Sequence, residues 1–556
     1  MSPLRPLLPV SLRHPPKRRL AVVVAACALL MAAWPAGLAL AQTEPASAAV
    51  RLPALGDATS DDLDINQERR LGDSIMRDIR RDPDFLDDPL LTEYLDSLVQ
   101  PLLQAGRERG AIDNDIQRAF AWQSFLVRDR AVNAFALPGG YVGVYLGLVG
   151  MTATPEELAS VLAHEITHVT QRHIARSMTN ASHQGMATMA ATILGLLAAS
   201  HARNIDTAQA VVVGSQAMMA QGQLNFSRDM EREADRIGLD LMGGAGFATS
   251  GMAAMFEKLD NASRLNDSGL YPYLRSHPLT SERISEARLR IGTAPTRAAV
   301  SRVDHLLMQA RARVLMDSTE GSLRRQQAMG QPGSPLADAT RLAALYGAAM
   351  ASTQLRDFDK ADQAIATGLT LASQQFAAEP HALRAFALLD LSNLIERSAT
   401  SATPATQATR LAQRMVATLA PLAGERSRVL QLARAQVALA HGRMGDATAP
   451  GLLRASTEEL QTWVAEHKGD ALAWQLLSQC AEPLGLHLRS LRAGAEAAMA
   501  RGDVLGAVDR FRAAQRAAKL AGTDEYLEAS IIESRLREVE HERRRLMAEA
   551  RGEKPE

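Results

Sequence analysis

The chain has 556 residues, which suggests about three to four domains. Lys and Arg total 61 against 62 for Asp and Glu, so the net charge of -1 argues against a broadly basic nucleic-acid binder. Hydrophobic residues make up 47% but aromatic residues only 4%, so the apolar mass is aliphatic and predicts a mostly helical protein. The 2 cysteines exclude a disulfide scaffold and a cysteine-ligated zinc finger.

The N-terminus has the pattern of an export signal. A basic segment ending at Arg19 precedes an apolar stretch from Leu20 to Leu40, which closes in an A-x-A pattern. We predict a secretory signal peptide over residues 1–41, cut after Ala41, and therefore a periplasmic mature protein. Two alternatives remain: an uncleaved membrane anchor, and lipidation at Cys27.

The first part of the mature chain alternates between helical and strand-forming patterns. A flexible leader is expected over residues 42–60, followed by helices over 65–80 and 89–107. Residues 125–150 are rich in strand formers around the turn sequence Pro138-Gly139-Gly140. We expect a β-hairpin or small sheet there.

A helix with clear start signals follows this sheet. Thr154 can cap it, Pro155 suits its first turn and Glu157 completes a capping box, so we expect a helix running to about Ser177. A further helix is expected over residues 229–241.

The Ala-, Met- and Leu-rich segment 186–220 has two interpretations. It is a buried helical pair, or it is a mobile lid that contacts clients or the membrane surface near the active site. Its apolar runs are too short to span a bilayer securely.

After about residue 300 the sequence is helical almost throughout. Two stretches match at one spacing and fit the helix-turn-helix pattern of a tetratricopeptide repeat, with a generic helical bundle as the alternative. The matched positions are Leu345, Ala349, Ala361, Ile365 and Gly368 against Leu491, Ala495, Ala507, Phe511 and Ala514. We predict a repeat domain over residues 300–523 and a charged, solvated helix or tail over 524–556.

The sequence His164-Glu165-Ile166-Thr167-His168 is an H-E-x-x-H motif inside the well-capped helix. His164 and His168 are one turn apart, so both rings can reach one cation. Glu165 lies beside them, where a metal-activated water would sit.

A catalytic zinc needs a third protein ligand. On the helix 229–241, Glu231 and Asp235 are four residues apart and share a face. Read alone, this run is a solvated acidic stripe. Beside the H-E-x-x-H motif, Glu231 is the expected third ligand and Glu233 its rival, while Asp235 is better placed to orient a ligand histidine.

These motifs together resemble a known family. Asn133-Ala-Phe-Ala-Leu-Pro-Gly-Gly140 precedes H-E-x-x-H, which is followed by Glu231-x-x-x-Asp235 and His277-Pro-Leu279. This order is similar to that of the membrane-linked gluzincin peptidases that include HtpX and the CAAX prenyl protease. The resemblance covers about residues 60–295 by motif.

The resemblance implies a zincin-type α+β metallopeptidase domain over residues 61–295 with one Zn2+ per chain. His164, His168 and Glu231 would bind the zinc, Glu165 would be the general base, and Asp235 would orient a ligand histidine. An edge strand would pair with an extended substrate. The substrate-binding residues would be Asn133, Ala134, Phe135, Gly139 and Gly140.

The combination of signal peptide, protease and repeat domain resembles a periplasmic branch of this family. It implies an endopeptidase that degrades misfolded or stalled outer-membrane proteins, assists their assembly, and docks on the assembly machinery through the repeats. The rivals are a non-catalytic chaperone or adaptor with a latent zinc site, and a secreted protease without an assembly partner. No nucleic-acid partner is expected.

The sequence suggests roles for four more residues. His277 is an exposed loop histidine or, as the family motif implies, a fourth ligand that keeps the enzyme latent. Arg283 would stabilise an oxyanion or pair with Asp235. His173 is expected to be structural or solvated, because it lies off the metal-facing stripe of a continuous helix, and Cys480 is expected to be a buried small hydrophobe.

Overall fold

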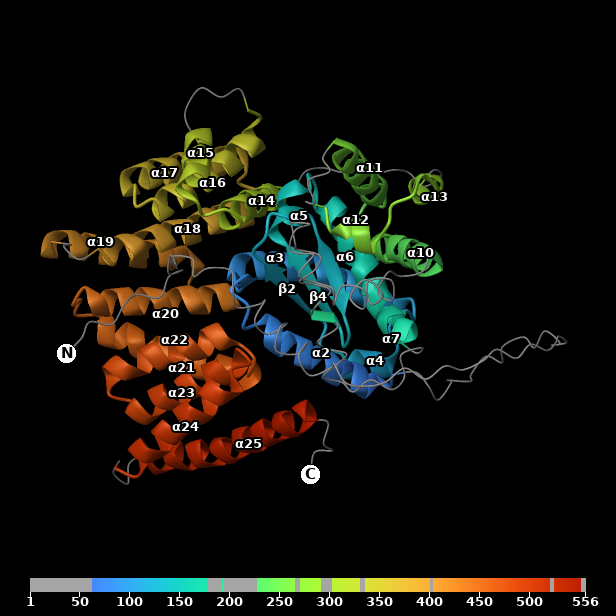
Figure 1. Ribbon diagram of the computed structural model, residues 1–556. Coiled ribbons are helices and arrows are strands. Elements are labelled where there is room, and N and C mark those ends of the chain that lie inside the picture. The colour runs from blue at the N-terminus through green and yellow to red at the C-terminus, as the bar shows by residue number, and fades with distance from the viewer. Residues whose placement is uncertain are drawn as a thin grey trace.

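The computed structural model describes residues 63–178, 193–194, 228–265, 271–291, 303–330, 336–400, 404–520 and 525–551. The expected signal peptide and leader, and nearly all of segment 186–220, lie outside these residues. The described part is mostly helical with one small mixed sheet, as expected (Figure 1). None of its helices is long and apolar enough to cross a membrane.

Two of the expected N-terminal helices are present. α2 covers Ile65–Ile79 and α3 covers Pro89–Glu108. Each begins at an aspartate whose side chain accepts a backbone N–H of the first turn, Asp64 in α2 and Asp88 in α3. The short helix α4, Asn114–Ala119, leads into the sheet.

The sheet confirms the expected hairpin and adds strands around it. Its strands lie in the order β1-β2-β4-β3, so β3 is an edge strand. β3 and β4 form the antiparallel hairpin, while β2 runs parallel to β4 and β1 is a short antiparallel addition. The strands cover Phe85–Leu86 (β1), Gln123–Val127 (β2), Ala134–Leu137 (β3) and Tyr141–Tyr145 (β4).

The turn between β3 and β4 needs glycine. Gly139 and Gly140 have φ of 75 and 89 degrees, which side chains rarely adopt. A Cβ on Gly139 would lie 2.8 Å from the Cα of Arg69. The tip of the hairpin therefore packs directly on α2.

The expected helix from Thr154 to about Ser177 is wrong in one respect, because it is two helices. α6 covers Pro155–Thr170 and α7 covers His173–Met178, after the short helix α5, Leu146–Met151. The chain turns between them at Arg172, whose φ of 51 degrees is left-handed and cannot continue an α-helix. The side chains of α7 therefore point in other directions than they would in a continuation of α6.

Four further helices lie on one side of α6 (Figure 1), and α10 and α11 pack directly against it. They are α10 (Arg228–Gly244), α11 (Ser250–Leu265), α12 (Tyr273–Ser276) and α13 (Ser281–Ile291). α10 approaches α6 closely at Gly238, where a Cβ would lie 3.3 Å from the backbone nitrogen of His164. This close contact brings the acidic face of α10 to the histidines of α6.

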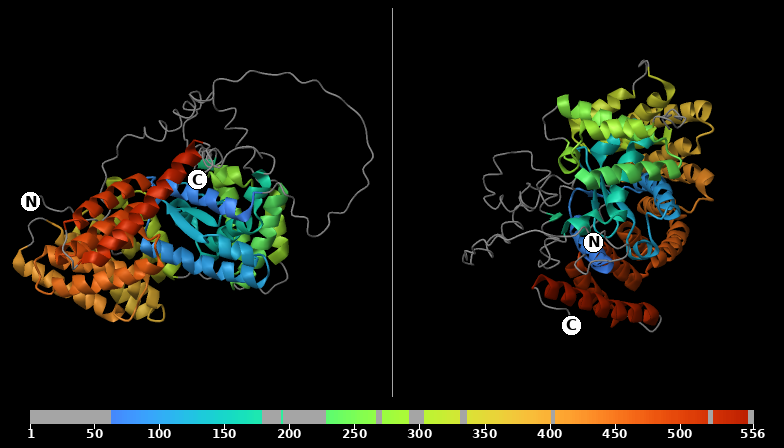
Figure 2. Two further views of the ribbon diagram at one scale, coloured as in Figure 1. Left: turned by 90° about the horizontal axis from the view of Figure 1, so that it is seen from below. Right: turned by 90° about the vertical axis from the view of Figure 1, so that its right-hand side faces the viewer.

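The C-terminal helices form a curved stack beside the N-terminal part, residues 63–291 (Figures 1 and 2). Consecutive helices pack against each other along the stack. They are α14 (Val303–Leu315), α15 (Glu320–Met329), α16 (Asp338–Gln354), α17 (Phe358–Gln375), α18 (Pro380–Ser398), α19 (Ala405–Leu419), α20 (Arg428–Arg443), α21 (Ala449–Glu466), α22 (Ala471–Ala481), α23 (His487–Ala500), α24 (Val504–Ala518) and α25 (Tyr526–Ala550), with 3-10 turns η3 (Ala420–Leu422) and η4 (Glu482–Leu484).

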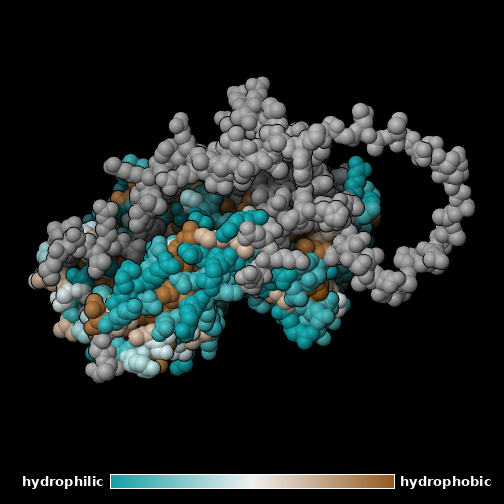
Figure 3. Space-filling model, turned by 60° about the horizontal axis from the view of Figure 1, so that its bottom comes forward, coloured by the Kyte–Doolittle hydropathy of each residue, from teal (hydrophilic) through white to brown (hydrophobic). Residues whose placement is uncertain are grey.

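The two matched stretches are the helix pairs α16–α17 and α23–α24, with turns where Arg356 and Gly502 have positive φ. Their assignment to the tetratricopeptide class stays a prediction. Cys480 is buried, as expected. The tail helix α25 is only half solvated, because Ile532 and Val539 are buried in the apolar cluster that α25 shares with α24. The described part of the molecular face drawn in Figure 3 is largely hydrophilic.

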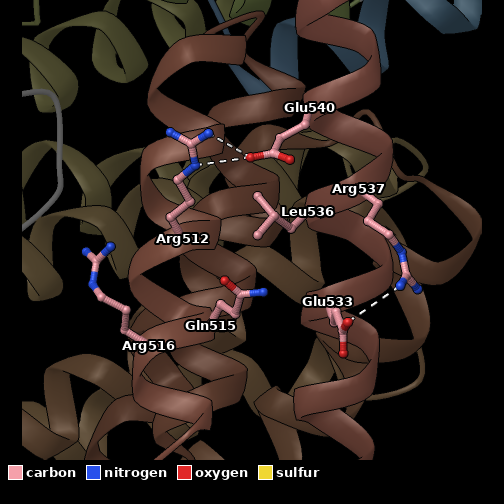
Figure 4. A pocket seen from close by; sticks show the side chains of 7 residues that line it. All are labelled: Arg512, Gln515, Arg516, Glu533, Leu536, Arg537 and Glu540. Carbon is pink, nitrogen blue, oxygen red and sulfur yellow. Dashed lines mark hydrogen bonds and ion pairs between the residues drawn. The ribbon is translucent and has the colours of Figure 1, made fainter.

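A polar hollow lies between α24 and α25, far along the chain from the H-E-x-x-H helix (Figure 4). Two ion pairs lie within the hollow, Arg512 with Glu540 and Arg537 with Glu533, and Arg516 also lines it. We therefore assign it a structural role.

The helix α14 connects the stack to the N-terminal part. His305, Gln309 and Arg313 are four residues apart and point the same way. His305 Nε2 and Gln309 Nε2 donate to the carbonyl of Thr152, at 3.0 and 2.5 Å, and Arg313 donates to that of Gly150. These carbonyls lie at the end of α5, directly before the metal-facing helix α6.

Arginines of the stack also bind carboxylates beside α3. Arg311 donates two hydrogen bonds to Asp88, at 2.8 and 2.7 Å. Arg428 binds Asp87 and Asp470 with two hydrogen bonds each, so one guanidinium joins both parts of the chain. We call these residues the arginine joint.

Candidate metal centre

The helix α6 presents its motif in a fully buried setting. Thr154 accepts the backbone N–H of Glu157, and the Glu157 carboxylate accepts that of Ala153, so the first turn is capped from both sides. His164, Glu165 and His168 are at most 2% exposed. The sequence thus places three polar side chains in the interior, where they need polar partners.

The helix α10 supplies those partners from its acidic face. Glu231 and Asp235 are 3% and 9% exposed, so the run is not a solvated stripe. Asp235 Oδ1 lies 2.9 Å from His164 Nδ1. This leaves the Nε2 atom of His164 facing the centre of the cluster.

Four side chains converge on one point. His164, His168, Glu231 and His277 each offer one ligand atom, and these atoms all lie within 4.8 Å of one another. The Nε2 atoms of His164 and His168 are 2.9 Å apart, and each is 3.5 Å from an oxygen of Glu231. Two or three imidazoles and a carboxylate are a donor set that suits zinc.

His277 is the C-cap residue of α12, and its side chain reaches the cluster from the end of this helix. Its Nδ1 lies 2.9 Å from Glu231 Oε1 and 3.3 Å from His164 Nε2. The residue is 2% exposed, so the alternative of an exposed loop histidine is wrong.

The protonation of the cluster follows from this packing. Burial opposes a charge on His164, but Asp235 and Glu231 outweigh it and raise the pKa of His164 to about 10. Burial favours the neutral carboxyl of Glu231, but the neighbouring His277 and His164 hold its pKa well below the usual value. Burial and the other histidines lower the pKa of His168. A proton on His164 thus occupies the centre that a cation would take.

Glu165 provides the observation that tests the fit to a metal. Both of its carboxylate oxygens are buried and neither accepts a hydrogen bond from a residue of the described structure. His277 Nε2 lies 3.5 Å from Oε1. A buried acceptor with such weak pairing is costly unless a ligand or water completes it, so the residues fit a metal with a water beside Glu165.

Arg283 closes the far side of the site. It donates to both oxygens of Asp235, at 2.7 and 2.8 Å, and its Nη1 lies 2.8 Å from Glu231 Oε2. Arg283 is only 5% exposed, and its guanidinium forms ion pairs with these two carboxylates. Of the two weighed roles, this arrangement matches pairing with Asp235.

His173 was expected off the metal-facing stripe, yet it is buried and its Nδ1 lies 2.9 Å from Nδ1 of His168. The turn at Arg172 makes this possible, and no feature of the motif spacing predicted it. Glu233, the rival ligand, lies outside the cluster and contacts His173 Nε2 at 3.0 Å.

The expected substrate edge lies next to α6. β3 carries Ala134 and Phe135 and packs against α6. Asn133 is buried directly before β3, and its side-chain oxygen accepts no hydrogen bond from the described residues. Gly139 and Gly140 form the hairpin turn at the other end of the strand. The edge therefore runs beside the buried motif.

Comparisons with known proteins agree with this geometry. Residues 93–291 match the model of Peptidase family M48. The chain is 36% identical over 336 residues to a putative beta-barrel assembly-enhancing protease of Vibrio cholerae, covering 58% of this chain and 63% of that protein. It is 32% identical over 296 residues to the beta-barrel assembly-enhancing protease of Escherichia coli K12, covering 53% and 58%.

A more distant match is the mitochondrial metalloendopeptidase OMA1 of Saccharomyces cerevisiae, 28% identical over 199 residues, covering 35% of this chain and 54% of that protein. The alignments with the bacterial proteases thus span about three fifths of their length. The resemblance inferred from the motifs is confirmed: residues 93–291 of this chain are similar to Peptidase family M48.

Proposed function

We propose that this protein is a periplasmic zinc-dependent endopeptidase that degrades misfolded or stalled outer-membrane proteins and assists their assembly. The observation that carries the proposal is the convergence of three histidines and Glu231 beside the weakly paired carboxylate of Glu165. A site that only stabilises the fold needs no buried base next to the ligands.

In this proposal His164, His168 and Glu231 hold one zinc ion. When bound, the zinc supplies Lewis acidity and lowers the pKa of a water molecule. Glu165 takes the proton from that water and returns it to the leaving amine. Asp235 keeps His164 in the tautomer whose Nε2 faces the cluster, and Arg283 holds Asp235 and Glu231 in place.

The edge strand β3 offers the substrate a surface to pair with. Main-chain hydrogen bonds to Ala134 and Phe135 would align an extended segment along α6, and Asn133, Gly139 and Gly140 would border it. Such pairing reads backbone more than side chains, which suits clients that share only an unfolded stretch.

We assign His277 a regulatory role at the same site. Its contacts with Glu231 and His164 put it where a fourth ligand would close the open position on the metal. The enzyme would then be latent until the loop after α12 moves.

The domain plan of the proposal has five parts: a signal peptide (1–41), a leader (42–60), the peptidase (61–295), tetratricopeptide-like repeats (300–523) and a charged tail (524–556). The names of the bacterial relatives, beta-barrel assembly-enhancing proteases, support the client class and an assembly partner. The curved stack of helices gives the surface for docking.

The second candidate is a chaperone or adaptor that uses the repeats while the zinc site stays latent. The close packing of His277 in the cluster favours it to that extent.

One experiment separates the two candidates. Purified wild type and Glu165→Gln are compared for zinc content and for cleavage of casein and of an unfolded outer-membrane protein. We expect about one zinc per chain in both, and a loss of cleavage in the variant of about 100- to 10,000-fold. Equal residual cleavage in both proteins would favour the chaperone.

A further inference from the structure

The ligand His168 has its own chain of contacts, separate from the one that supports His164. His168 Nδ1 lies 2.9 Å from His173 Nδ1, and His173 Nε2 lies 3.0 Å from Glu233 Oε2. Glu233 in turn pairs with Arg176 at 3.1 Å. The chain runs from the cluster to the surface, since the exposure of the side chains rises from 0% at His168 and His173 to 29% at Glu233 and 47% at Arg176.

The hydrogen-bond roles in this chain are fixed by chemistry. A histidine that binds metal through Nε2 keeps its proton on Nδ1, so His168 must donate. His173 must then accept at Nδ1 and carry its own proton on Nε2. That proton points at Glu233, whose carboxylate can only accept.

Two local features of the fold, the turn before α7 and the acidic face of α10, produce this arrangement. The left-handed turn at Arg172 starts α7 in a new direction, and His173 is its first residue. The two rings meet with centroids 4.9 Å apart and planes at 75 degrees, which is an edge contact and not a stack. On α10, Glu231 faces the cluster while Glu233 reaches His173.

We propose that His173 is a positioning residue for the metal ligand His168, and that Glu233 fixes the tautomer of His173. It rests on the proposed zinc site. The contact orients the His168 ring and strengthens it as a donor, as outer partners of metal-bound histidines generally do. The counterpart on the other ligand is Asp235, which contacts His164 directly.

The test compares His173→Leu with His173→Asn in the full chain. Asparagine keeps an oxygen near the place of Nδ1, so it can still accept from His168, whereas leucine keeps only the apolar bulk. Zinc affinity is measured by competition with a chelator, and Co2+ is bound to record its visible absorption. We expect His173→Leu to weaken zinc binding about 10- to 100-fold and to shift the Co2+ spectrum, and His173→Asn to recover part of both.

Equal losses in the two variants would show that the hydrogen-bond acceptor at this position does not support His168, and zinc affinity unchanged in His173→Leu would overturn the proposal outright. Should neither variant fold, Glu233→Ala is compared with Asp229→Ala, a matched change on the same helix at a side chain that is 87% exposed. We expect a few-fold weaker zinc binding for Glu233→Ala alone, and equal behaviour would refute the role. A wild type that binds no zinc would overturn the proposed function as well.

Discussion

Two charged clusters of this molecule can be compared, the buried metal cluster and the partly buried arginine joint. In the joint, both oxygens of Asp87, Asp88 and Asp470 accept hydrogen bonds from arginine. In the metal cluster, the Nε2 atoms of His164 and His168 lie 2.9 Å apart, and the carboxylate of Glu165 accepts no hydrogen bond from the residues that the structure describes. The first set of charges is complete within the chain, and the second set is complete only with a ligand.

This difference separates charges that hold the fold from charges that serve chemistry. A guanidinium fork matches a carboxylate with two hydrogen bonds, so the joint gains both energy and a fixed geometry. The metal cluster instead brings three imidazoles and a carboxylate around one point, an arrangement that a cation would hold together. The predictions below disturb one cluster and leave the other as its control.

The largest effect is expected from Glu231→Ala, because it removes a metal ligand. We expect the zinc content to fall from about one per chain to nearly none, and cleavage of casein to fall by more than about 100-fold. The comparison with Arg428→Ala sharpens the result, since that variant disturbs only the joint and should keep its zinc. Zinc retained by Glu231→Ala would assign the third ligand elsewhere.

The next effect is on stability. Arg428→Ala leaves the carboxylates of Asp87 and Asp470 without their shared partner, which should cost on the order of 1.5–3 kcal/mol. Urea unfolding followed by circular dichroism would measure the loss, with limited proteolysis to show where the chain opens. Arg324→Ala, from an exposed pair with Glu320 on α15, should change stability by less than about 0.5 kcal/mol. An equally small effect at Arg428 would contradict the assignment of the joint.

A third effect depends on pH in the metal-free protein. His164 has a pKa raised to about 10 in the fold against 6.5 for the ordinary residue. Its stabilising contribution is therefore complete below pH 6.5 and is lost as the pH rises toward 10, by at most about 1.4 kcal/mol per unit. Thermal unfolding at pH 6.5, 8 and 9.5 would measure it. Saturating zinc should remove the slope, and a slope that persists with zinc would place its origin outside the cluster.

The smallest effect is expected at His277. Replacing it by alanine should free the open metal position and raise basal casein cleavage a few-fold, with zinc still bound by the other three ligands. Initial rates per bound zinc give the measurement. Unchanged or lower rates would mean that His277 supports the site and does not restrain it.

The sequence predicted the parts of the site that local patterns encode. Helical spacing predicted α2 and α3, and capping residues predicted the start of α6. The H-E-x-x-H spacing placed His164 and His168 on one face with Glu165 beside them, and all three are buried. Turn residues predicted the hairpin but not the parallel partner β2, because pairing of distant strands leaves no local periodicity.

The contacts that the sequence missed depend on single backbone angles and on distant helices. One left-handed residue, Arg172, divides an expected helix and turns His173 toward His168. For His277 and Arg283 the sequence left two roles open, and the choice between them depends on how distant helices are placed, with α13 packed on α10 and α11. The buried face of α25 was also missed, because the many charged residues of this helix obscure the spacing of its apolar residues.

The hydrogen bonds from α14 determine where the chain can be shortened. The match to the family model stops at residue 291, but the carbonyls of Gly150 and Thr152 are satisfied by His305, Gln309 and Arg313 further on. A protein ended at residue 291 would lose these donors at the base of the metal-facing helix. The shortest independent peptidase should therefore extend through the end of α14 at Leu315, with the first helix of the stack kept as its last.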